Sequence, residues 1–389
     1  MRILKGLFIL LLGFGTLSSP FIHGPYTGDP SEDAVTVSWT MEPPLRARVE
    51  YAPYDRFTAS GDFTAFVEYE PGRTSGRETV HVRLKGLEGG AKYAYRVVLY
   101  DDASEHQSPV GTFHTAPPPG TPVAFAVISD TQWRNWTHPN RIELVGDALA
   151  ADPTPFQFIL HSGDVVEHPF RKYWDHLFAS LSEALLRAPL IPVLGNHERG
   201  HRSYYDYFDL PPGGGKYGER WWALHWGDIV VVGLDSNVRD PEVYGEQVTW
   251  LREHLSGPEP HKFVVFHHPV FTSDSYYGPG SPGLEALWHP VFVEYGVDVV
   301  FNGHAHNYER IVRDGITYLV VGGAGGPRYP LSGERVEGSV VGDDRHHFYV
   351  RVFTSPEGIR VEVVQVARVE GDEVVPVSGL LDSFELPAD

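Results

Sequence analysis

The chain has 389 residues and a formal net charge of -20 at pH 7, with 31 Lys and Arg against 51 Asp and Glu. This excess of negative charge excludes nucleic acid and anionic membranes as general partners, because both would be repelled. Cysteine is absent, which excludes disulfides and thiolate metal sites. An anionic ligand would therefore need a local positive centre, and a bound metal ion is the natural source of one.

The first 19 residues have the pattern of a secretory signal. Arg2 and Lys5 precede an apolar run at 6–17, and Ser18 and Ser19 follow it. The run is short for a membrane span, and an uncleaved anchor or a buried helix is the alternative. No later stretch is long and apolar enough to cross a bilayer. We expect a secreted or periplasmic protein with no transmembrane domain beyond this segment.

Residues 20–115 consist of short segments in which apolar and polar side chains alternate. Segments 35–39 and 79–84 show the alternation clearly, and their spacing predicts an all-β sandwich. Trp39 and Tyr93 stand where a fibronectin type III domain has its core aromatic residues, so this part of the chain resembles that domain. Both side chains are expected in the core rather than in a functional site.

Residues 116–120 read Ala-Pro-Pro-Pro-Gly, a sequence that helices and central strands do not tolerate, which predicts a linker. In residues 121–370, apolar strands alternate with helical segments such as 171–188, where apolar side chains recur every three or four residues. This predicts an α/β layered fold of αββα type with a mixed β-sheet. Residues 371–389 are expected to form a C-terminal tail.

Five polar loops each follow one of the expected strands of this second domain. Asp130 and Asp164 are 34 residues apart, and Asp164 and Asn196 are 32 apart, about the length of one strand–helix unit. Successive units would bring these loops to the same edge of the sheet, together with those that carry His267 and His304. Carboxylate, amide and imidazole groups gathered there are typical metal ligands.

Each of these residues also has an ordinary structural explanation. Asp130 or Asp164 could cap a helix, Asn196 could turn a loop, and His267 or His304 could be satisfied by backbone groups. All five explanations holding at once is far less common than any one of them. A shared metal site is therefore the preferred interpretation.

The five motifs, in this order, closely resemble the calcineurin-like metallophosphoesterase superfamily. Residues 303–310 read Gly-His-Ala-His-Asn-Tyr-Glu-Arg, which is similar to the G-H-x-H-x-Y-E-R signature of its purple acid phosphatase-like branch. Members of that branch also commonly have a fibronectin-like domain before the catalytic domain. The resemblance covers both domains, roughly residues 20–370.

The resemblance implies a site for two metal ions. Asp164 would bridge both ions, and Asp130 and His306 would complete the first site. The second site would be completed by Asn196, His267 and His304. Two ions held in this way lower the pKa of a shared water and bind both the attacking and the phosphoryl oxygens.

The resemblance also implies residues that contact the substrate. His197 would stay unligated and either donate a proton to the leaving oxygen or hydrogen-bond to the phosphoryl group, with Asn196 beside it. Tyr277 lies where the branch often has a further histidine, so a phenol could replace that group. Arg310 could approach the phosphate, although a structural ion pair is its other explanation.

Two positions depart from the family pattern. The purple enzymes have a tyrosine three residues beyond the bridging Asp, where this chain has Glu167, and that tyrosine favours ferric iron. Gln132 replaces a family glycine and could supply an amide oxygen to the first metal. Glu167 as that ligand, or Gln132 bound only to water, are the alternatives. We therefore expect two ions of iron, manganese or zinc, without a fixed ferric site.

The sequence thus predicts a secreted dinuclear-metal phosphatase that hydrolyses small phosphate monoesters by attack of a metal-bound hydroxide, with Asp164 and His197 in the catalytic roles. A phosphodiesterase or nucleotidase with the same metals is the first alternative, and Trp133, Trp136, Tyr276 and Tyr277 could stack on a base or an aromatic leaving group. A surface-binding protein without activity is the second. Nothing in the sequence indicates an oligomeric state.

Overall fold

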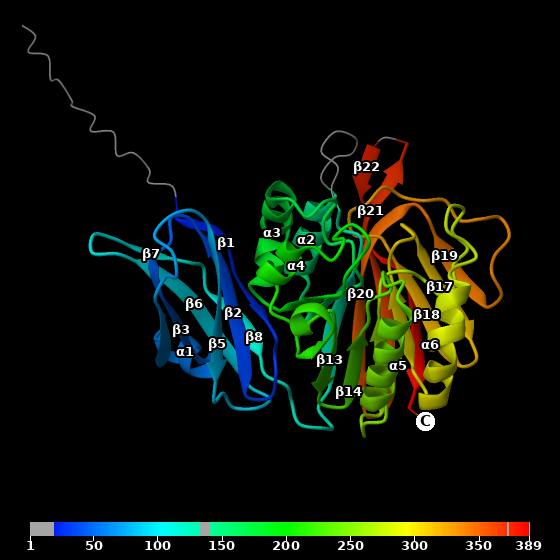
Figure 1. Cartoon of the computed structure of the whole chain (residues 1–389), viewed down its shortest axis with the longest axis horizontal. Helices are drawn as coiled ribbons and strands as arrows, with labels where there is room; N and C mark the ends of the chain where they lie inside the picture. Colours follow the sequence, from blue (N-terminus) through cyan, green and yellow to red (C-terminus); the bar gives the residue numbers. More distant parts are fainter. Residues whose placement is uncertain (1–18, 133–140, 372, 389) are drawn as a thin grey trace, which may run out of the picture.

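The computed structural model describes residues 19–132, 141–371 and 373–388. It has a β-sandwich followed by a layered α/β unit, which confirms the expected fold class (Figure 1). The expected signal segment lies outside the described residues except for its last residue, and so do Trp133 and Trp136. Among the described residues, no helix has the length and apolar character needed to cross a bilayer.

The sandwich packs a three-stranded sheet, β1-β2-β5, against a five-stranded sheet with the order β4-β3-β6-β7 and β8 beside β6. Trp39 and Tyr93 are buried in its core, as expected, and the Tyr93 hydroxyl accepts a hydrogen bond from the Glu88 amide. The elements are β1 (Phe21–Gly28), β2 (Ala34–Met41), β3 (Arg46–Pro53), α1 (Tyr54–Ser60), β4 (Ala65–Tyr69), β5 (Glu78–Lys85), β6 (Lys92–Tyr100), β7 (Glu105–Gln107) and β8 (Gly111–His114).

The α/β unit contains two sheets that pack face to face. The first has the order β11-β10-β9-β20-β21-β22, with β23 also paired to β21. Its strands are β9 (Val123–Ile128), β10 (Ile159–His161), β11 (Leu190–Pro192), β20 (His346–Ser355), β21 (Gly358–Glu370), β22 (Glu373–Pro376) and β23 (Leu380–Pro387). The last two lie in the segment expected as a tail, so the sheet continues beyond residue 370.

The second sheet has the order β12-β13-β14-β15-β16-β18-β17-β19. Its strands are β12 (Gly213–Gly214), β13 (Trp221–Trp226), β14 (Ile229–Gly233), β15 (His261–Val265), β16 (Val299–Asn302), β17 (Tyr308–Arg313), β18 (Ile316–Val321) and β19 (Ser339–Asp343). Neighbouring β14, β15, β16 and β18 run parallel, which aligns their carboxyl ends.

Helices cover both outer faces, which gives the expected αββα layers (Figure 1). They are α2 (Ile142–Ala151), α3 (Arg171–Leu185), α4 (Arg202–Tyr207), α5 (Pro241–Leu255) and α6 (Pro282–Tyr295), with a 3-10 turn at Lys216–Gly218. Successive residues of β14 pack into different hydrophobic cores. Val231 packs between the sheets, whereas Val230 and Val232 pack under α5 and α6, because successive side chains of a strand point to opposite faces.

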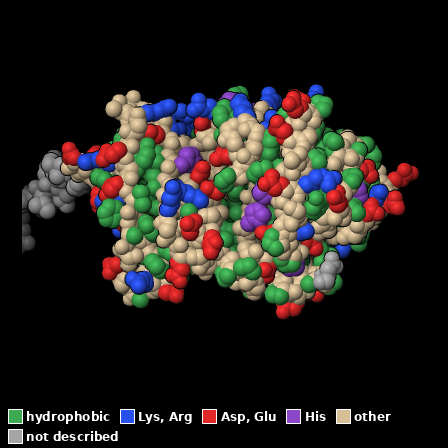
Figure 2. Space-filling model, turned by 60° about the horizontal axis from the view of Figure 1, so that its bottom comes forward, with side chains coloured by type: hydrophobic (Ala, Val, Ile, Leu, Met, Phe, Trp, Pro, Cys, Tyr) green, Lys and Arg blue, Asp and Glu red, His purple; other side chains and the backbone are tan. Residues whose placement is uncertain are grey.

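Polar contacts attach the sandwich to the α/β unit. Asp175 of α3 lies 2.6 Å from His23 Nε2 and 2.5 Å from an Arg77 nitrogen, and the Tyr26 hydroxyl donates to the Tyr207 carbonyl. Tyr26 is also part of the larger α/β core. Acidic, basic and hydrophobic side chains are interspersed over the face in Figure 2.

Candidate metal centre

The five predicted loops come together, but from two sheets rather than one. Asp130, Asp164 and Asn196 follow β9, β10 and β11 of the first sheet, whereas His267 and His304 follow β15 and β16 of the second. The expectation of a single sheet edge was wrong. Because the two sheets pack face to face with these strand ends on the same side, the loops still meet.

The backbone at three predicted ligands is held in the left-handed region. Asp130, Asp164 and His304 have φ angles of 56°, 53° and 67°, which are uncommon for residues other than glycine and cluster at functional sites. The loops are also closely packed, since a Cβ atom on Gly195 would lie 2.1 Å from Asp164 Oδ1. Local strain therefore directs these side chains into a common space.

The ligand atoms lie at the separation expected around shared cations. His267 Nε2 is 3.1 Å from both Asp164 Oδ2 and Asn196 Oδ1, and His306 Nε2 is 3.3 Å from Asp130 Oδ1. Atoms that bind one cation at about 2.1 Å lie about 3 Å apart. The donor set therefore fits metal ions. Asp130 and His306 form one close pair, and ligand atoms of Asp130, Asp164 and His267 all lie within 4.8 Å of one another.

The charges in this cluster also favour a cation. Both carboxylates are fully buried. Burial alone would raise the pKa of Asp164, but the charges of His267 and His197 and their hydrogen bonds hold it below its usual value. For His267, burial lowers the pKa, whereas Asp164 and Asp130 outweigh it and raise the pKa to about 9. A metal ion can replace the proton that these carboxylates attract.

Hydrogen bonds from the far side of the ring orient the histidines. His267 Nδ1 lies 3.0 Å from the Ser162 carbonyl and His306 Nδ1 lies 2.7 Å from the Pro327 carbonyl, which leaves each Nε2 facing the cluster. This is the usual arrangement behind a metal-binding imidazole.

His304 and His268 lie together beside the cluster. Their ring centroids are 4.5 Å apart, and with His267 they form a second group of converging nitrogens. His268 Nδ1 is 2.9 Å from Ser236 Oγ. Burial, and then the charge of His267, lower the pKa of His268 to about 2, so this imidazole is neutral. His268 therefore lies beside the predicted ligands His267 and His304.

Gln132 and Glu167 occupy different parts of the site. Gln132 is buried with its Nε2 3.1 Å from His306 Nε2, and its Oε1 has no hydrogen-bond partner among the described residues. Glu167 Oε2 instead lies 3.7 Å from His197 Nδ1. Gln132 is therefore placed beside the Asp130–His306 pair, and Glu167 beside His197.

His197 lies at the site without joining either group of ligands. Its amide donates to Asp164 Oδ1 at 2.9 Å, and its Nδ1 lies 2.8 Å from the Glu167 carbonyl. Nε2 is 3.7 Å from Asp164 Oδ2. An imidazole held through Nδ1 can present Nε2 to a ligand in the site.

Of the two other predicted substrate contacts, the structure brings only one to the site. The Tyr277 ring lies 4.0 Å from that of His304. Arg310 instead pairs with Asp382 of β23 at 2.7 Å and lies over the Phe384 ring. Its pairing agrees with the structural explanation and disagrees with a contact to phosphate.

Sequence reasoning missed two residues of the site. Tyr329 stacks on His306 with ring centroids 4.1 Å apart and an angle of 6°, and no strand-end pattern marks it. Buried Glu198 accepts hydrogen bonds from the amides of Asp164, Val166 and Gly195. The sequence signal that could have identified Glu198 is its position two residues after Asn196, because a carboxylate there can reach the neighbouring loop.

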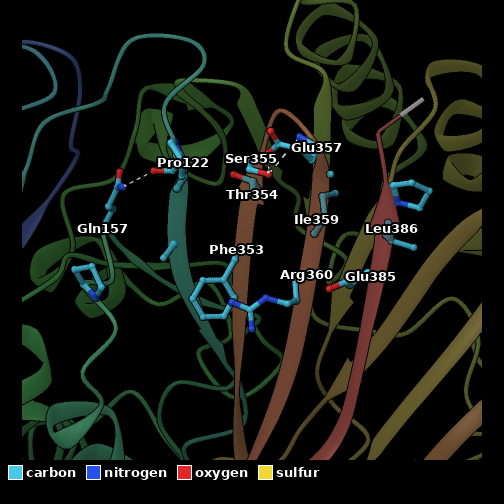
Figure 3. A pocket seen from close by; sticks show the side chains of 15 residues that line it. Pro122, Gln157, Phe353, Thr354, Ser355, Glu357, Ile359, Arg360, Glu385 and Leu386 are labelled. Carbon is cyan, nitrogen blue, oxygen red and sulfur yellow. Dashed lines mark hydrogen bonds between the residues drawn. The ribbon is translucent and has the colours of Figure 1, made fainter.

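A cavity of about 650 Å³ lies elsewhere (Figure 3). It is lined by the start of β9, the turn between β20 and β21, and the end of β23. Since Asp130 follows the opposite end of β9, this cavity is remote from the metal ligands.

Comparison with known families and proteins identifies both parts of the chain. Residues 123–308 match the model of calcineurin-like phosphoesterases, and residues 15–117 match the N-terminal domain of PhoD-like phosphatases. A phosphoenolpyruvate phosphatase from Allium cepa is 27% identical over 78% of this chain and 65% of its own length. Purple acid phosphatase 18 from Arabidopsis thaliana is 25% identical over 68% of this chain and 63% of its own length. The chain thus spans somewhat less than two thirds of these relatives.

Solved structures share the fold. A purple acid phosphatase from seeds of yellow lupin (Lupinus luteus) superposes with a TM-score of 0.75 at 17% identity, covering 96% of this chain and 75% of that one. PhoD superposes with a TM-score of 0.72 at 17% identity, covering 96% and 92%. The matches to the two families, rather than these fold similarities, identify residues 123–308 as a calcineurin-like metallophosphoesterase domain behind a PhoD-like N-terminal domain, and the chain is a homologue of the purple acid phosphatases.

Proposed function

We propose that the protein is a metal-dependent phosphatase that hydrolyses phosphate monoesters outside the cytoplasm. The convergence of two buried carboxylates with His267, His306 and Asn196 from five strand ends carries this proposal. When bound there, two metal ions would acidify a water molecule and neutralise charge on the phosphoryl oxygens. The fully buried Asp164, whose oxygens lie near both His267 and His197, is the proposed bridge.

The chain's own groups would bind and protonate the substrate. His197 Nδ1 is held by the Glu167 carbonyl, so its Nε2 is available to protonate the leaving oxygen or to hydrogen-bond to the phosphoryl group. Asn196 lies beside it, and Tyr277 forms part of the wall next to His304. The basic, apolar and small residues of the first 19 positions support export. Finding the full-length chain only in the cytoplasmic fraction of its host would contradict export.

Metal analysis followed by a substrate panel tests the activity. We expect hydrolysis of p-nitrophenyl phosphate at a higher kcat/KM than of bis-p-nitrophenyl phosphate; the reverse order would favour the diesterase. Asp164→Ala should lower kcat/KM roughly a thousandfold, since it removes a group shared by both ions. Asp147→Ala, on the exposed face of α2, is the control. If the metal-loaded protein hydrolyses neither ester, the remaining hypothesis is a binding protein without catalytic activity.

The absent tyrosine predicts the colour of the protein. Glu167 stands where the purple enzymes have their iron-binding tyrosine, so we propose iron, manganese or zinc in the site without a ferric tyrosinate. Iron-loaded protein should lack an intense visible charge-transfer band. A strong band that disappears in Tyr329→Phe would show that a tyrosine from another loop has taken over the role.

A further inference from the structure

A cleft lined by arginines adjoins the metal centre. It has a volume of about 400 Å³, and its walls include Asn196 and His268 as well as three arginines, Arg199, Arg220 and Arg239. Asp235 is the acidic residue of its lining. This concentration of positive charge is unusual for a chain with a net charge of -20, and it lies next to residues assigned to phosphate chemistry.

The three arginines are not equivalent. Arg220 Nε is 2.6 Å from buried Asp235 Oδ2, whose other oxygen accepts two hydrogen bonds from Asn237. That pair is therefore already neutralised. Arg199 and Arg239 are exposed, and neither has a hydrogen bond or ion pair from its side chain within the described structure.

The backbone of Arg199 is also held in a fixed conformation. It follows Glu198, which three backbone amides hold in the core, and its own φ angle of 56° is left-handed. A non-glycine residue keeps such a conformation only where its surroundings impose it. The guanidinium is thus attached to the same fixed turn that carries Asn196 and His197.

We propose that Arg199 and Arg239 bind a second anionic group of the substrate, next to the phosphate that the metal centre would hydrolyse. This rests on the proposed function. The preferred substrates are then compounds with a second phosphate or carboxylate near the scissile phosphate, because guanidinium groups bind such oxygens through paired hydrogen bonds. Phosphate esters of neutral alcohols use the metal centre alone.

Binding of unreactive analogues to the metal-loaded, full-length protein tests this without catalysis. Calorimetry would compare methylphosphonate with methylenediphosphonate and with phosphonoacetate, which separate a second phosphate from a carboxylate. We expect at least one of the doubly anionic analogues to bind about tenfold more tightly than methylphosphonate. Arg199→Gln/Arg239→Gln should remove that preference and leave methylphosphonate binding within about twofold.

Arg202→Gln is the matched control, since Arg202 is an exposed arginine three residues beyond Arg199 that pairs with Asp206. It should retain the preference. Equal binding of all three analogues by the wild type, or an unchanged preference in the double variant, would overturn the proposal.

Kinetics separate this proposal from the function on which it rests. With p-nitrophenyl phosphate and ADP as substrates, the double variant should lose about tenfold in kcat/KM for ADP, mainly through KM, and little for the aryl ester. If the wild type hydrolyses neither substrate but still binds a doubly anionic analogue more tightly, the proposed phosphatase activity is wrong and the proposed anion-binding cleft stands. An equal loss of kcat/KM on both substrates would contradict the proposed anion-binding cleft and leave the proposed phosphatase activity in place.

Discussion

At the residue scale, Gln132 presents one amide atom to His306 and leaves the other buried. Without a cation, its Nε2 can donate to His306 Nε2, and Oε1 has no partner among the described residues. A metal on His306 would reverse this preference and attract Oε1, because a cation repels an amide hydrogen. Gln132→Leu should therefore weaken the first metal site about tenfold or more, as measured by metal content after dialysis against a chelator.

Glu167→Gln provides the comparison, because Glu167 lies by His197 and not by His306. We expect it to retain both ions. If Glu167→Gln lost one ion while Gln132→Leu kept both, Glu167 would be the ligand and the assignment of Gln132 would be wrong.

At the scale of elements, Glu198 ties the loop after β10 to the loop after β11. It accepts the amides of Asp164, Val166 and Gly195 at 2.8 to 3.1 Å. Glu198→Ala would leave these buried donors unpaired, and we expect a loss of about 3 kcal/mol in the free energy of unfolding. Urea denaturation would measure it, with Glu253→Ala on the exposed side of α5 as the control. A loss no greater than that of the control would show that water replaces the carboxylate.

At the scale of the whole molecule, two acidic residues near the junction of the sandwich and the α/β unit should make stability depend on pH. Burial, and then Asp209, raise the pKa of Glu219 to about 7. Burial raises the pKa of Asp29 to about 6, with Asp209 adding to the effect and Arg83 opposing it. The folded state therefore binds protons that the unfolded state does not hold between about pH 4 and 7, so their contribution to stability increases as the pH falls through this window.

Glu219→Gln isolates this effect from the metal centre. It should raise the Tm at pH 7.5, where the wild type carries the buried charge, and change it little at pH 4.5, where that carboxyl is largely protonated. Differential scanning calorimetry of both proteins across this range is the measurement, and Glu373→Gln, exposed in β22, is the control. A Tm difference independent of pH would contradict the raised pKa.

The sequence predicted that these side chains converge, because each follows its own strand and local pattern was sufficient to place it at a strand end. It was wrong about the single sheet edge, since the parallel pairing of β15 with β14 and β16 in a second sheet depends on contacts between distant segments. Asp382, the partner of Arg310, lies 72 residues further along the chain in the expected tail. Tyr329 lies in a loop whose path is determined by packing, and no repeated sequence pattern predicts its position.

The left-handed turns at Asp130, Asp164 and His304 limit how this centre can change during evolution. Asparagine, aspartate and glycine adopt such a backbone most readily, so an exchange at these positions must satisfy both the metal and the main chain. Asn196, His267 and His306 have no positive φ, so the backbone conformation does not restrict which side chain can replace them. A lineage that adapts to another metal is thus expected to vary those three positions first, while keeping the strained ones fixed.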